Sequence, residues 1–65
     1  MTDDGLLTVR EREVLELVRA RLRDEEIAAR LGIAPSTVAA LLGSSMRKLG
    51  AATRVEAAAR LARPE

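Results

Sequence analysis

The stretch DEEIAARLGIAPSTVAALLGSSMRKLG, residues 24–50, carries two helical patterns separated by a very short break. The first pattern predicts a helix over about 25–31, and Gly32 suits a left-handed helix end. Pro35 then suits the first position of a second helix, where its missing N–H group leaves no hydrogen bond unmade. Because only about three residues join the two helices, with the glycine at the bend, the stretch predicts a helix-turn-helix.

The second helix of this stretch has one apolar side and one small or polar side. The predicted buried stripe recurs at helical spacing and consists of Val38, Leu42, Met46 and Leu49. The opposite side holds Ser36, Ala39, Ala40, Gly43, Ser44 and Arg47. A helix-turn-helix can place its second helix in the major groove of DNA, although helix pairs with a glycine turn also occur without DNA. From geometry alone, both uses stay open.

Capping signals predict one further helix on each side of this pair. TVRE, residues 8–11, has the pattern of a capping box and predicts a helix over about 9–21. TRVE, residues 53–56, repeats that pattern and predicts a helix that ends before Pro64. Asp24 is the predicted N-terminal cap of the helix over about 25–31.

The expected fold class is all-α, a four-helix bundle containing a helix-turn-helix. No strand pattern interrupts the helical segments, and residues 1–65 are too few for more than one small domain. The apolar fraction of 48% includes no aromatic residue. A core without rings buries less area per residue, which makes oligomerisation or attachment to a larger protein more plausible.

Several functions are disfavoured by composition. The chain has no Cys and no His, so disulfides, the usual zinc sites and most catalytic constellations are excluded. We therefore expect neither an enzyme nor a cofactor. No apolar run approaches the roughly 20 residues of a membrane span, and the acidic N-terminus is unlike a signal peptide. A cytoplasmic protein without a membrane partner is expected.

Charge gives a weaker indication of the partner. The formal net charge is only +1, well below that of a strongly basic nucleic-acid binder. The acidic residues nevertheless concentrate before position 26, and basic residues dominate the second half of the chain. This asymmetry is a modest signal for an anionic partner.

Five separate motifs resemble the LuxR-type helix-turn-helix domain of bacterial transcription regulators. They are LTVREREVLELV, EEIAARLGI, STV, RKLG and TRVEAAARLA, and they follow in the family's order and spacing over about residues 7–62. The resemblance implies a four-helix DNA-binding module whose third helix lies in the major groove. It also implies homodimerisation through the fourth helix and, if the chain is an excised fragment, a receiver or sensor domain as partner.

The resemblance also implies which residues meet double-stranded DNA. Phosphate partners are expected at Ser36, Thr37, Arg47, Lys48 and Arg54. Base contacts are expected from the positions of Ala39, Ala40 and Gly43, with Ser44 on the same side of the helix. Within the family, the residue at Glu13 mainly ties the first helix to the turn.

This sequence departs from the family's pattern at the positions that would read bases. The family typically has Lys at the position of Ala39, a DNA-reaching residue at that of Ala40, His at that of Leu41, and often a polar or basic residue at that of Gly43. Four further positions depart from the family. Arg21 stands where the family has a glycine, and Arg23 where it has a capping serine. Glu25 replaces a common lysine, and Ser45 replaces an apolar residue. The departures predict weak sequence preference.

Two functions of different classes therefore stand. The first is sequence-weak, phosphate-driven binding of double-stranded DNA in bacterial transcription regulation, as a homodimer. The alternative is a helix-turn-helix scaffold that binds another protein through the patch formed by Ala39, Ala40, Leu41 and Gly43. A weaker resemblance to the last domain of sigma factors is disfavoured by the TRVEAA tail.

Overall fold

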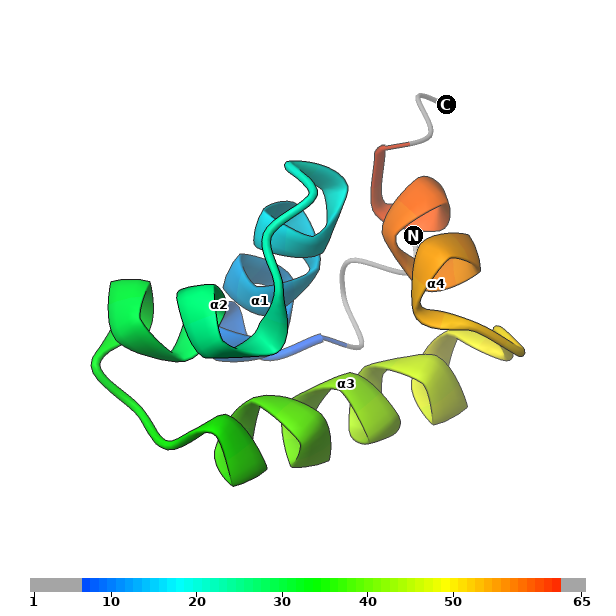
Figure 1. The fold of residues 1–65 in the computed structure, drawn as a ribbon. Helices are drawn as coiled ribbons and strands as arrows, with labels where there is room; N and C mark the ends of the chain where they lie inside the picture. Colours follow the sequence, from blue (N-terminus) through cyan, green and yellow to red (C-terminus); the bar gives the residue numbers. More distant parts are fainter. Residues whose placement is uncertain (1–6, 63–65) are drawn as a thin grey trace.

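Four α-helices make up the described part of the chain. The computed structural model describes residues 7–62 and contains α1 (Val9–Arg19), α2 (Asp24–Leu31), α3 (Pro35–Leu49) and α4 (Arg54–Ala62), with no strand among these residues. In Figure 1, α3 runs along the bottom of the molecule, and the other three helices lie above it. The all-α fold with four helices is as predicted. The predicted stop at Pro64 lies outside the described residues.

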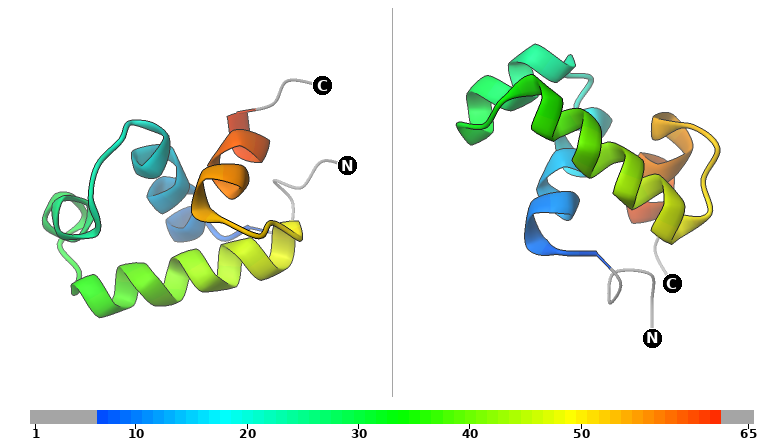
Figure 2. Two further views of the ribbon diagram at one scale, coloured as in Figure 1. Left: turned by 45° about the vertical axis from the view of Figure 1, so that its right-hand side comes forward. Right: turned by 90° about the horizontal axis from the view of Figure 1, so that it is seen from below.

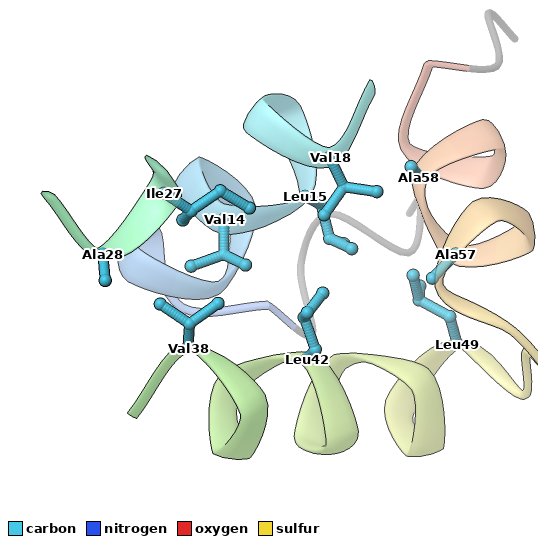
Figure 3. Packing of buried hydrophobic residues seen from close by; sticks show 10 residues of the cluster. All are labelled: Val14, Leu15, Val18, Ile27, Ala28, Val38, Leu42, Leu49, Ala57 and Ala58. Atoms are coloured by element: carbon cyan, nitrogen blue, oxygen red, sulfur yellow. The ribbon is translucent and has the colours of Figure 1, made fainter. Parts of the chain in front are cut away.

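The core lies between α1 and the other three helices. Its residues are small or medium in size, as Figure 3 shows, and comprise Val14, Leu15, Val18, Ile27, Ala28, Val38, Leu42, Leu49, Ala57 and Ala58. Leu15 and Ile27 are the largest apolar side chains that are fully buried. Because α1 contributes three core residues near the centre, it is the element on which α3 and α4 pack.

The helix-turn-helix forms as predicted from the short break in the sequence. The chain bends by 104° between α2 and α3, within the range of about 90–120° for this motif. Gly32 has φ 70° and ends α2, while Pro35 begins α3. Within residues 7–62 no single helix is long and apolar enough to span a membrane, and only this sharply bent pair reaches the required length and composition together.

Three helices end with a left-handed residue, and the N–H of the next residue donates to the carbonyl five positions earlier in each of them. Gly32 and Gly50 follow α2 and α3 with φ 70° and 65°, and Arg21 follows α1 with φ 72°. After α1, the N–H of Leu22 donates to Leu17 O at 3.1 Å, which is the long bond of a Schellman motif. The predicted helix over 9–21 is therefore too long by two residues, because the left-handed turn at Arg21 ends α1 at Arg19.

The helix starts follow the predicted caps in part. At α1 the capping box is complete. Thr8 Oγ1 accepts from the N–H of Glu11 at 3.1 Å, and the carboxylate of Glu11 accepts from the N–H of Thr8 at 2.8 Å. The prediction for Asp24 is wrong. The cap position of α2 is Arg23, and Asp24 is the first helical residue, with its carboxylate bound to Arg54 instead.

The buried stripe of α3 also differs from the prediction at one position. Ser45 is fully buried, whereas Met46 is only half-buried. The Ser45 hydroxyl donates to Leu41 O at 2.8 Å, one turn earlier in the helix. This bond within α3 satisfies the hydroxyl, so a polar side chain occupies a core position where an apolar residue is usual in the family.

Candidate nucleic-acid interface

The outer side of α3 is the candidate DNA-binding surface. Among residues 7–62 no other element covers this side of the helix, as the views in Figures 1 and 2 agree. Of the predicted site residues on α3, those exposed are Ser36, Thr37, Ala39, Ala40, Arg47 and Lys48. Gly43 and Ser44 are half-buried. The polypeptide thus presents a long face of small side chains, with hydroxyls at one end and basic groups at the other.

The N-terminal end of α3 is suited to an anion. Ala34 occupies the cap position without a side-chain hydrogen bond, and the first turn contains no acidic residue. The hydroxyls of Ser36 and Thr37 are exposed beside it. Pro35 has no N–H group and the N–H of Thr37 donates to Ala34 O at 2.9 Å, so the positive end of the helix dipole and the exposed hydroxyls are what favour a phosphate here.

The other end of the face is connected to α1 through a buried carboxylate. Glu11 is 3% exposed, and its two oxygens accept from both neighbouring side chains of α3. Lys48 Nζ donates to Oε1 at 2.8 Å and Ser44 Oγ donates to Oε2 at 2.6 Å. Two residues expected at the DNA therefore have their polar atoms on the protein's own acidic group, and their contact with DNA stays a prediction.

The pKa of Glu11 reflects this environment. Burial raises the pKa, but the hydrogen bonds from Lys48, Ser44 and the backbone N–H of Thr8 outweigh it and lower the pKa to about 2. The carboxylate is therefore ionised at neutral pH and balances the charge of Lys48.

Arg47 is the basic residue of α3 that keeps its charge unbalanced. It is exposed and forms no ion pair with another described residue. A Cβ atom at Gly43 would lie 3.7 Å from Arg47 Nη1, so the guanidinium lies back along the outer face, over the preceding turn. Arg47 is the long cationic side chain on the candidate surface that is available to a phosphate.

Arg54, another expected phosphate partner, is paired with α2. Its guanidinium binds the carboxylate of Asp24 through both nitrogens, with an Nη2–Oδ2 distance of 3.2 Å for one of the two bonds. The hydrogen bond from Arg54 holds the pKa of Asp24 below its ordinary value. The side chains are 42% and 32% exposed, so solvent weakens the pair, and its net contribution to stability is small.

Glu11 is the residue whose contact with α3 the sequence interpretation missed. The family resemblance assigns the tie between helix one and the turn to Glu13, and this is wrong, because Glu13 is half-exposed and pairs with Arg10 at 3.1 Å. Glu11 precedes Val14, Leu15 and Val18 at helical spacing, so it lies on the buried stripe of α1. That register is the signal that would have placed Glu11 inside.

What the fold and the exposed α3 face define is a helix-turn-helix domain. Residues 5–61 match the family model described as bacterial regulatory proteins, luxR family. A curated relative, Transcriptional regulatory protein UhpA of Escherichia coli (strain K12), is 44% identical over 55 residues, which are 85% of this chain and 28% of that protein. The chain belongs to the luxR family of bacterial regulatory proteins. It is a DNA-binding domain of bacterial transcription regulation, and the family is one of regulators rather than enzymes.

Proposed function

We propose that this domain binds double-stranded DNA mainly through phosphates, with little preference for sequence. The observation that carries the proposal is the exposed α3 face, which has an uncapped N-terminal end, Arg47 at the other end and no acidic side chain between them. Its length from Pro35 to Leu49 is sufficient for a groove helix. A bacterial regulator that binds chromosomal DNA in this way acts in the cytoplasm.

Weak sequence preference follows from the chemistry of the face. A good bidentate contact with a base edge is worth about 1–3 kcal/mol of discrimination. Ala39, Ala40 and Gly43 have no donor or acceptor in their side chains, and their contribution is limited to apolar contact with a thymine methyl group. Phosphate contacts then supply most of the affinity, which falls steeply with salt.

The proposal includes homodimerisation through α4. Val55 is 70% exposed, and Ala59 is exposed one turn later on the same helix. Ala58, on the same helix, is buried in the core of the monomer. The apolar surface left on α4 is therefore small.

Sedimentation equilibrium of the wild type and of Val55→Asp tests the proposed homodimerisation, because the charged variant loses a dimer formed through α4.

A domain that receives a signal is a further proposed partner. The chain spans 28% of the length of UhpA, a transcriptional regulatory protein. We propose that such a receiver or sensor domain controls the access of α3 to DNA.

The alternative function, protein binding through the Ala39, Ala40, Leu41 and Gly43 patch, has one observation in its favour. The first two residues are exposed and the other two are half-buried, so the patch is smooth and largely free of charge. Gly43→Arg distinguishes the two functions. It adds a cation where DNA is proposed to lie and therefore strengthens DNA binding, whereas it blocks a protein that packs on the patch.

Fluorescence anisotropy with random and genomic duplexes at two salt concentrations tests the proposed function. We expect similar affinities for both duplexes and a strong loss of affinity with salt. Arg47→Gln should weaken binding to all duplexes, and Ala40→Lys should strengthen it. Absence of any binding at about 50 mM salt, where phosphate contacts are strong, would exclude phosphate-driven binding.

A further inference from the structure

A shallow groove lies at the corner where α1 turns into α2. Its volume is about 700 Å³, and it is lined by Arg21, Leu22, Glu26, Ala29 and Arg30. In Figure 1 the segment that joins α1 to α2 reaches the top of the molecule, whereas α3 runs along the bottom. None of the residues that line the groove belongs to α3 or α4, although Arg21 also lines a second hollow together with Val55 and Ala59 of α4.

The groove carries a net positive charge, because Arg21 and Arg30 line it together with one acidic residue, Glu26. Its one carboxylate, that of Glu26, already accepts from the backbone N–H of Arg23 at 2.7 Å, and the guanidinium of the same arginine lies at 3.6 Å. Arg21 and Arg30 are exposed, and neither forms an ion pair with another residue in the described range 7–62. Two guanidinium groups thus line the groove without a bound carboxylate.

Arg21 occupies its place at a cost to folding. Its φ of 72° is left-handed, and for a residue with a side chain this conformation costs about 1–2 kcal/mol relative to the right-handed one. Glycine adopts it freely, as the other two helix ends of this type show with Gly32 and Gly50. Folding alone therefore disfavours an arginine here, and this strained residue is one of the five that line the groove. Backbone strain of this kind is a pointer to function.

We propose that the α1–α2 corner binds an acidic segment of a partner protein, with carboxylates on Arg21 and Arg30 and an apolar side chain against Leu22 and Ala29. The guanidinium fork suits bidentate pairing with carboxylates. The mixture of apolar and cationic lining suits a polypeptide better than a nucleic-acid backbone, and the corner faces away from the outer side of α3. This function goes beyond DNA binding, because it lets the domain hold a protein while α3 is on the duplex.

A designed peptide of alternating Glu and Leu pairs serves as the probe, and the same peptide with Lys in place of Glu is its control. We expect the acidic peptide to shift the amide NMR signals of residues 21–30 and the control peptide to leave them unchanged. Arg30→Gln and Arg21→Gly should each weaken binding of the acidic peptide by about two- to fivefold, as for an exposed ion pair.

Matched variants separate this proposal from the proposed DNA binding. Arg30→Gln should leave DNA affinity unchanged, whereas Arg47→Gln should weaken DNA binding and leave peptide binding unchanged. If Arg30→Gln weakens DNA binding as much as Arg47→Gln does, the corner belongs to the DNA surface and the proposal is wrong. It is equally wrong if the acidic peptide shifts α3 or α4 instead of the corner, or if both peptides bind alike.

Discussion

Lys48 on α3 and Glu11 on α1 form an ion pair with an Nζ–Oε1 distance of 2.8 Å, although 37 residues separate them in sequence. Ser44 adds a second bond from α3 to the same carboxylate. These two bonds fix the rotation of α3 about its own axis relative to α1. Lys48, one of the expected phosphate partners, is therefore a structural contact inside the domain.

Acid should destabilise the domain through Glu11. In the folded protein the pKa of Glu11 is about 2, against an ordinary value of 4.5. Because the folded-state pKa is the lower one, the stabilisation is complete above pH 4.5 and is lost as the pH falls towards 2. Urea unfolding across this range, followed by far-UV circular dichroism, measures the loss. Glu11→Gln should lower the free energy of unfolding by about 2–3 kcal/mol at neutral pH and should show a flatter acid dependence.

Substitution of the strained residue after α1 should stabilise the fold. Arg21→Gly removes the left-handed strain, and we expect the free energy of unfolding to rise by about 1 kcal/mol after the greater freedom of the unfolded chain is allowed for. Arg19→Gly is the matched control. It places glycine inside the last turn of α1 and should lower stability by about 1 kcal/mol. Equal effects of the two variants would contradict the assigned backbone conformation.

Gly43 should tolerate a side chain. An added Cβ atom meets only Arg47 Nη1, at 3.7 Å, among atoms outside its own helical surroundings. Gly43→Ala should therefore raise the free energy of unfolding by about 1 kcal/mol, the difference between the two residues inside a helix. Gly32→Ala has open space as well but a φ of 70°, and it should lower stability by about 1 kcal/mol. Thermal melts of the two variants test this opposite response.

Releasing Arg54 from Asp24 should allow its guanidinium to contact a DNA phosphate. Asp24→Asn weakens the pair, and the freed guanidinium is expected to steepen the slope of log affinity against log salt by about 0.9, the contribution of one phosphate. The cost in stability should stay within about 1 kcal/mol, since the pair is partly exposed. The double variant Asp24→Asn, Arg54→Gln should lose the steeper slope. A slope that stays steep in the double variant would show that Arg54 is not the group released.

Local signals in the sequence predicted the helices well. They did not predict contacts between residues that are distant in the chain. Gly32, Pro35 and the box at Thr8 act within a few residues, so their patterns alone placed three of the helix boundaries. The pairs Lys48–Glu11 and Arg54–Asp24 join residues 37 and 30 positions apart. Their formation depends on how α3 and α4 pack against the first two helices, which no local pattern contains.

The same limit explains one of the errors at single positions. Asp24 has the chemistry of a cap, but a guanidinium from α4 competes for its carboxylate. The predicted stripe includes Met46, but the buried position is that of Ser45, whose hydroxyl donates to Leu41 O within its own helix. Arg21 interrupts a pattern that continues helically in sequence, and its left-handed backbone follows from the hydrogen bonds that close α1. Only the carboxylate of Asp24 is bound by a partner distant in sequence; the bond at Ser45 lies within its own helix, and those at Arg21 close the end of α1.

The residues that hold α3 in place and the residues that face outward from it are different ones. Ala39 and Ala40 contribute nothing to the core and lie outside the bonds made by Glu11. On the proposed DNA-binding face, asparagine, lysine or arginine at these two positions should therefore change the contacts with bases without disturbing the fold. Evolution of a new regulon from such a domain would need no compensating change in its interior.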